Sequence, residues 1–145
     1  MQLYTIGFTK KTARQFFDTL KEAGVERLVD IRLRPDSQLA GFAKREDLLF
    51  FLERLNGCAY QYEPSLAPSD DLLKAYRENK NWKAYETGYL RLLRERSMPQ
   101  SLDRISFKEL RNCLLCSEAE PDKCHRRLAA EEIQKYWENV QIIHL

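Results

Sequence analysis

The 145-residue sequence contains five glycines and four cysteines, and it has no apolar run of membrane-spanning length. So few glycines argue against a glycine-rich phosphate cradle, and the Walker loop, the dinucleotide-binding glycine fingerprint, the HExxH motif and the nucleophile elbow are all missing. The first residues read directly as a strand rather than as a secretory signal. We therefore expect a cytoplasmic protein with reduced thiols, no membrane contact and an oligomeric state that the sequence leaves open.

Basic and acidic side chains nearly balance, with 24 Lys and Arg against 22 Asp and Glu and a net charge of +2. This balance excludes a strongly basic coat for nucleic acid, but it allows a local basic patch. The length suits one domain, residues 1–145, with a core of its own.

Apolar periodicity predicts strands that alternate with helices. The expected strands cover 3–6, 27–31, 58–62, 112–116 and 140–144. Helices are expected to start at Thr12 (with Gln15 in a capping box and Gly24 at the end), near Lys44 (ending at Gly57), at Ser69, near Trp82, at Ser106 and near Asp122. We therefore predict a single α/β domain. Its mostly parallel sheet has about five strands, helices cover both faces, and a helical insertion at 64–104 separates the third and fourth strands.

The unusual polar residues follow the predicted strands. Open parallel sheets bind ligands beyond the carboxyl ends of their strands. The residues at those ends, or in the loop that follows the fourth strand, are Gly7, Asp30, Arg32, Cys116, Glu118, Cys124, His125 and Arg126. Because all of these fall on one rim of the sheet, we expect the functional site there.

Cys124, His125 and Arg126 lie where the last helix is expected to begin. A helix N-terminus and neighbouring cations lower a cysteine pKa from about 8.5 toward neutrality. The segment thus predicts a reactive thiol beside an arginine that binds a carboxylate or phosphate. The alternative is that Cys124 only packs, Arg126 pairs with Asp122 and His125 is solvated.

Four potential zinc ligands also occur close together in the sequence. They follow the order C-x2-C-x7-C-H: Cys113, Cys116, Cys124 and His125. Residues three apart in a strand point to opposite faces, so Cys113 and Cys116 should diverge. The apolar Leu114–Leu115 also differs from the glycine- or proline-containing turn of a zinc knuckle. We therefore expect neither a metal nor another cofactor.

Asp30 and Arg32 share one face at strand spacing, so an ion pair between them is the simplest expectation. The functional alternative makes Asp30 a general base and Arg32 an anion clamp. Glu118 is the other acid near the rim, and it serves either as an acid or base or as a partner for Arg32 or Arg126.

Three other groups favour structural roles. The helical stripe Trp82, Tyr85 and Tyr89 is more typical of a core than of a base-stacking platform. The basic run Arg91, Arg94 and Arg96 is expected on a solvated helix face. His144, in the terminal strand, is expected to be structural.

The ordered motifs of the chain resemble a bacterial and archaeal family called domain of unknown function 488. The resemblance rests on Tyr4–Phe8, Leu28–Arg32 with Ser37, Leu114–Glu118, Cys124–Arg126 and Ile142–His144. It implies that Asp30, Arg32, Cys116, Glu118, Cys124, His125 and Arg126 share one pocket. Two departures are visible, because the family usually has His at the position of Phe8 and Leu-Gly at the position of Leu66-Ala67.

Three functional hypotheses follow. The first is an enzyme or ligand binder for a small anionic substrate, such as a nucleotide or phosphorylated metabolite. Arg32 and Arg126 hold the anion beside Gly7, Ser37 and Cys116; Cys124 is the nucleophile or redox thiol, Asp30 or Glu118 moves protons, and His125 tunes the thiol. The second is a nucleic-acid-associated module whose phosphate-contacting rim comprises Arg32, Arg34, Lys44, Arg45, Arg126 and Arg127. The third is a structural or regulatory protein without catalysis.

Overall fold

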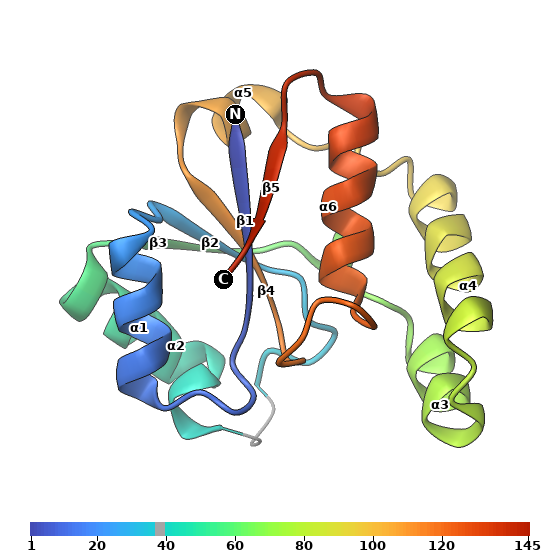
Figure 1. Ribbon diagram of the computed structural model, residues 1–145, viewed down its shortest axis with the longest axis horizontal. Helices are drawn as coiled ribbons and strands as arrows, with labels where there is room; N and C mark the ends of the chain where they lie inside the picture. The colour runs from blue at the N-terminus through green and yellow to red at the C-terminus, as the bar shows by residue number, and fades with distance from the viewer. Residues whose placement is uncertain (37–39) are drawn as a thin grey trace.

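The computed structural model describes residues 1–36 and 40–145. Its centre is one five-stranded sheet in the order β3-β2-β4-β1-β5, with every neighbouring pair parallel (Figure 1). The strands are β1 Gln2–Gly7, β2 Arg27–Asp30, β3 Ala59–Tyr62, β4 Asn112–Cys116 and β5 Gln141–His144. The predicted parallel α/β architecture is therefore confirmed.

Helices cover both faces of the sheet, as predicted (Figure 1). One face carries α1 Ala13–Glu22, the short turn η1 Gly41–Ala43, and α2 Arg45–Phe51 with its π-helical extension η2 Leu52–Asn56. The other face carries α3 Asp70–Asn79, α4 Trp82–Glu95, α5 Arg104–Glu109 and α6 His125–Tyr136. The predicted insertion between the third and fourth strands consists of η3 Pro64–Leu66 with α3, α4 and α5. Within the described ranges, no helix is both long and apolar enough to cross a membrane.

The order of the strands creates a crevice at their carboxyl ends. The chain moves outward from β1 through β2 to β3, then returns to β4 between β2 and β1 and continues to β5 at the opposite edge. Consequently β2 and β4 are neighbours, yet the chain leaves β2 toward α2 on one face and leaves β4 toward α6 on the other. Such a reversal opens a crevice between the two departing loops, where ligands bind in sheets of this class.

Local signals position several helix ends as predicted. The hydroxyl of Thr12 accepts from the Gln15 amide at 3.1 Å, and the Gln15 side chain accepts from the Thr12 amide at 2.8 Å, completing the capping box. Ser69 caps α3 through a bond from the Leu72 amide at 3.2 Å. Gly57 follows η2 with a left-handed φ of 60°, a conformation that glycine adopts at little cost.

Two predicted helix starts are wrong. The helix expected at Ser106 begins at Arg104, because the carboxylate of Asp103 accepts from the amides of Ile105 and Ser106 at 3.1 and 3.2 Å. The last helix begins at His125 rather than near Asp122, with Cys124 as its N-cap.

The end of α6 also departs from the predicted apolar face. That face ran from Ala129 to Val140, but the helix stops at Tyr136, whose side chain is 48% exposed. Trp137 and Val140 reach the core from the connection that follows the helix.

The aromatic stripe of α4 lies in the core, as predicted. Tyr85 and Tyr89 are buried and stack at 6.3 Å, whereas Trp82 is only partly buried. His144 likewise has the expected structural contact, because its Nδ1 lies 2.7 Å from the hydroxyl of Thr5.

The basic run at the end of α4 behaves only partly as predicted. Arg91 and Arg94 are exposed. Arg96 is not simply solvated, because its guanidinium donates to the carbonyls of Pro64, Ser65 and Ala67 and so fastens η3 to α4.

Candidate functional site

A cleft of about 390 Å³ lies at the carboxyl ends of β2 and β4. This volume falls within the range of small-molecule sites, which is roughly 300–1,000 Å³. Its lining comes from the loop after β2 (32–34), the loop after β4 (116–118), the start of α6 (123–125), Pro68, and the α3 and α4 side chains Leu73, Tyr76, Arg77, Trp82 and Tyr85. The insertion thus forms a wall that faces the two strand ends.

Cys116 and Cys124 meet at the floor of this cleft. Cys116 ends β4, and Cys124 returns to it as the N-cap of α6. Both are free thiols, with exposed fractions of 0% and 2%, and their sulfur atoms lie 2.6 Å apart. The sheet and the helix therefore bring together two thiols that are eight residues apart in the chain.

Arg126 is completely buried beside these sulfurs. Its Nη1 donates to the Cys116 sulfur at 3.1 Å and to the Glu118 carbonyl, and its Nη2 donates to the Ala119 carbonyl at 3.0 Å. The expected alternative, an ion pair with Asp122, does not form. A buried guanidinium favours a compensating negative charge, and the Cys116 sulfur at 3.1 Å can supply one by ionising.

The two thiols differ in acidity. Burial opposes ionisation of Cys116, but hydrogen bonding from Cys124 and the charge of Arg126 outweigh it and hold the pKa below its ordinary value. Burial and the neighbouring Cys116 sulfur raise the pKa of Cys124. Ionisation of the pair is therefore favoured at Cys116, the sulfur closer to Arg126.

His125 is partly buried rather than solvated, and its Nε2 lies 2.9 Å from the carbonyl oxygen of Ile31. Because a carbonyl only accepts, Nε2 carries the hydrogen and Nδ1 is the unprotonated nitrogen. Burial lowers the pKa of His125 to about 4, so the ring is neutral at physiological pH. The same hydrogen bond ties the start of α6 to the segment that follows β2.

Asp30 and Arg32 form the ion pair expected from their spacing. Arg32 donates from Nε to Oδ1 at 2.8 Å and from Nη2 to Oδ2 at 2.6 Å, and Tyr60 donates to Oδ2 at 2.7 Å. The third arm of Arg32 donates to the carbonyl of Ala43, and the ring of Phe8 lies 5.4 Å from the guanidinium. Asp30 is fully buried beneath the cleft, and Arg32, 3% exposed, lies at its edge.

The remaining predicted residues take different positions. The Glu118 side chain is exposed on the rim, while its backbone carbonyl holds Arg126. Gly7 lets the Glu118 carbonyl and the Arg126 guanidinium lie close to its backbone. A Cβ at this position would overlap that carbonyl and lie 2.9 Å from Nη1 of Arg126. Ser37 lies outside the described residues.

The three groups nearest to a metal-binding set are Cys116, Cys124 and His125, whose ligand atoms lie within 4.8 Å of one another. Cys113 packs into the core on the opposite side of the sheet, as strand alternation predicts. The structure thus brings three of the four potential zinc ligands together and leaves Cys113 out.

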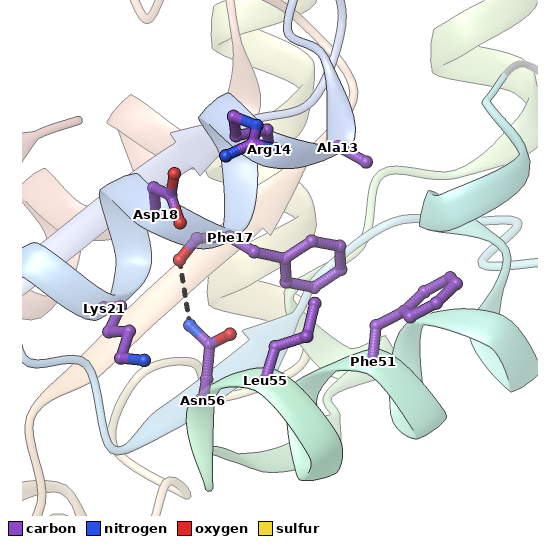
Figure 2. A pocket seen from close by; sticks show the side chains of 8 residues that line it. All are labelled: Ala13, Arg14, Phe17, Asp18, Lys21, Phe51, Leu55 and Asn56. Carbon is purple, nitrogen blue, oxygen red and sulfur yellow. Dashed lines mark hydrogen bonds between the residues drawn. The ribbon is translucent and has the colours of Figure 1, made fainter.

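A second cavity, of about 330 Å³, lies between α1 and η2 (Figure 2). Phe17, Phe51 and Leu55 are the large apolar side chains in its lining, and Asn56 donates to the Phe17 carbonyl at 2.9 Å. Its lining contains neither cysteine nor histidine. The cleft at the strand ends is therefore the better candidate for chemistry.

Sequence reasoning missed the α3 residues of the cleft wall. These are Leu73, Tyr76 and Arg77, in an insertion whose polar sequence has no motif that marks a site. The nucleic-acid hypothesis also placed two side chains on a phosphate-contacting surface although both are buried. Arg126 and Arg32 are 0% and 3% exposed, so neither lies on an open face for a nucleic-acid backbone.

A family model matches residues 12–133 of the chain, a span that includes β2, β4, both cysteines of the cleft and Arg126. No curated protein and no solved structure matches the sequence. The matched span covers most of the 145 residues. The chain therefore belongs to the family described as Domain of unknown function DUF488.

Proposed function

We propose that the protein is an enzyme, or an enzyme-like binder, that acts on a small anionic substrate in this cleft, with Cys116 as the reacting thiolate. The observation that carries the proposal is the burial of the Arg126 guanidinium 3.1 Å from the Cys116 sulfur. A thiolate is the nucleophilic form of cysteine, and an adjacent cation keeps it deprotonated.

The charges around the cleft favour an anion. Its lining contains four cationic side chains, Arg32, Arg34, Arg77 and Lys123, and one carboxylate, Glu118. Arg32 is neutralised by Asp30, and Arg34 shares Asp70 with Lys74. Arg77 and Lys123 are exposed and face the opening from α3 and from the start of α6. These two residues are therefore our candidates for the first contacts with a phosphate or carboxylate.

The aromatic wall narrows the substrate class. Tyr76 and Trp82 line the cleft with their rings 5.8 Å apart. Their planes meet at 70°, and aromatic side chains beside cationic ones suit a substrate that joins a ring to an anionic group, as nucleotides do.

The roles of the two cysteines differ from our first expectation. The charge distribution favours Cys116 over Cys124 as the nucleophile, with Cys124 donating a hydrogen bond to it. Neutral His125 offers Nδ1 as a proton acceptor, and Glu118 is the accessible acid or base on the rim. Asp30 supports the site by fixing Arg32 rather than by moving protons.

The binding test uses nuclear magnetic resonance titrations with inorganic phosphate and adenosine monophosphate. We expect shifts confined to the cleft, and Arg77→Ala and Lys123→Ala should weaken binding severalfold. Arg91→Ala is the matched control, because it removes an exposed α4 cation outside the cleft. If Arg77→Ala and Lys123→Ala bind phosphate and adenosine monophosphate as tightly as the control Arg91→Ala, the proposal is contradicted. A steep salt dependence with long single-stranded DNA but no response to mononucleotides would favour nucleic acid instead.

The thiolate is tested by the rate of alkylation with iodoacetamide as a function of pH. A component with a low pKa should disappear in Cys116→Ser, and saturating adenosine monophosphate should slow it in the wild type. Cys58 is an internal control, since burial raises the pKa of its thiol to about 11. A fast component that survives in Cys116→Ser would overturn the assignment.

A further inference from the structure

We propose that Cys116 and Cys124 are a redox pair, in which a hydroperoxide oxidises Cys116 and Cys124 then closes a disulfide with it. This inference rests on the assignment of the thiolate to Cys116 in the proposed function. It adds an oxidation site, a class of oxidant and a role for Cys124.

The geometry of the two sulfurs supports the pairing. They already lie in contact at 2.6 Å, at the end of a central strand and the start of the helix packed on it. A disulfide needs closely approaching Cβ atoms and fails where the backbone must move far. Here the sulfurs start in contact, whereas Cys113 belongs to the core cluster on the other face and Cys58 lies beside β3.

Access separates this pair from the other two thiols. Cys116 and Cys124 both line the cleft, although almost none of their surface is exposed. An oxidant that enters the cleft therefore lies next to these two residues and not next to Cys58 or Cys113. Cys58 and Cys113 are buried away from the cleft, and burial raises the pKa of each thiol. Oxidation should therefore be selective for Cys116.

The reaction balances in two steps. The Cys116 thiolate attacks the outer oxygen of the hydroperoxide, so that an S–O bond forms, the O–O bond breaks and the departing oxygen takes a proton from water. The Cys124 sulfur then attacks the resulting sulfenic acid. An S–S bond forms, the S–O bond breaks, and the leaving hydroxide takes the Cys124 proton to become water. The dithiol has given two electrons to the peroxide, and an added dithiol such as dithiothreitol restores both thiols by exchange.

Arg126 is positioned to assist both steps. Its Nη1 lies 3.1 Å from the Cys116 sulfur and 3.6 Å from the Cys124 sulfur. It stabilises the attacking thiolate in the first step and the negative charge that develops at the sulfenic oxygen in the second. Closing the disulfide removes the thiolate, so oxidation should also abolish the alkylation of Cys116.

The experiment treats the reduced full-length chain with stoichiometric hydrogen peroxide and analyses it by intact mass and peptide mapping. The wild type should become lighter by two hydrogen atoms, with Cys116 linked to Cys124, and dithiothreitol should reverse the change. Cys124→Ser should instead accumulate a sulfenic acid at Cys116 that dimedone traps. Cys116→Ser should form no disulfide with hydrogen peroxide and should not be labelled by dimedone. The matched controls Cys58→Ser and Cys113→Ser should behave like the wild type.

Four outcomes would overturn the inference. These are four intact thiols in the treated wild type, a disulfide that uses another cysteine, a sulfenic acid trapped at Cys124, or thiols that react only after a chelator removes a bound metal. The phosphate and nucleotide titrations separate this inference from the proposed function. Anion binding without disulfide formation defeats only the redox pair, and disulfide formation without anion binding defeats only the proposed substrate.

Discussion

Arg126 places its Nη1 3.1 Å from the sulfur of Cys116, and both side chains are completely buried. The same guanidinium also holds the backbone carbonyls of Glu118 and Ala119, which belong to the loop between the two residues. One side chain thus fastens the loop after β4 and favours ionisation of the thiol at the start of that loop. Structure and reactivity at this site are coupled through Arg126.

Replacing Arg126 with Lys should raise the pKa of Cys116, because the ammonium cannot reproduce the forked contacts with the sulfur and the loop carbonyls. We expect the alkylation rate at neutral pH to fall by roughly tenfold for each unit of pKa increase. Arg127→Lys is the matched control, since this neighbouring arginine pairs with Glu131 and not with the sulfurs. Unchanged alkylation in Arg126→Lys would mean that Arg126 does not control the thiol.

Asp30→Asn should destabilise the fold strongly, because it leaves the Arg32 charge buried without its partner and alters the bond from Tyr60. Breaking a buried pair in this way costs about 3–5 kcal/mol. Asp70→Asn breaks exposed pairs with Arg34 and Lys74, which water and salt screen, and it should destabilise the fold far less. Urea denaturation measures the free energy of unfolding of both variants. Equal losses of stability would contradict the structural role of Asp30.

Gly7→Ala should also be destabilising, since the new Cβ would overlap the Glu118 carbonyl and crowd Nη1 of Arg126. Overpacking of this kind typically costs about 1–3 kcal/mol. Gly41→Ala is the control, because a Cβ there meets nothing within 4 Å. Thermal unfolding should show a lower midpoint for Gly7→Ala than for Gly41→Ala. The alkylation rate of Cys116 should change only in Gly7→Ala.

His125 should make the folded state less stable as the pH falls. Its ordinary pKa of 6.5 applies to the unfolded chain, whereas burial, with a smaller contribution from Arg126, lowers the folded-state pKa to about 4. Between these values the unfolded state binds more protons, so stability decreases on acidification through that window. His125→Gln should flatten this part of the stability curve measured by urea denaturation. His144→Gln replaces the only other histidine, which is more exposed, and should leave most of the slope in place.

Much of the fold follows from local sequence. Helix caps and apolar periodicities depend on residues three or four apart, so Thr12, Gln15 and Ser69 mark helix starts without knowledge of the tertiary structure. Alternation of strands and helices similarly implies a parallel sheet, and a parallel sheet brings its carboxyl ends to one rim. The location of Cys116 and Cys124 near this rim was therefore predictable.

The tertiary structure alone decided how these residues face one another. The strand order placed β2 beside β4, which joined His125 to Ile31, 94 positions away in the sequence. It also turned Arg126 inward to the sulfur and brought Arg77 from the insertion to the opposite wall. Local propensities act over a few residues, whereas these contacts depend on the packing of α6 against the sheet, of α4 against α6 and of α3 against α4. Which sulfur ionises more readily follows from that packing and not from the order of the residues.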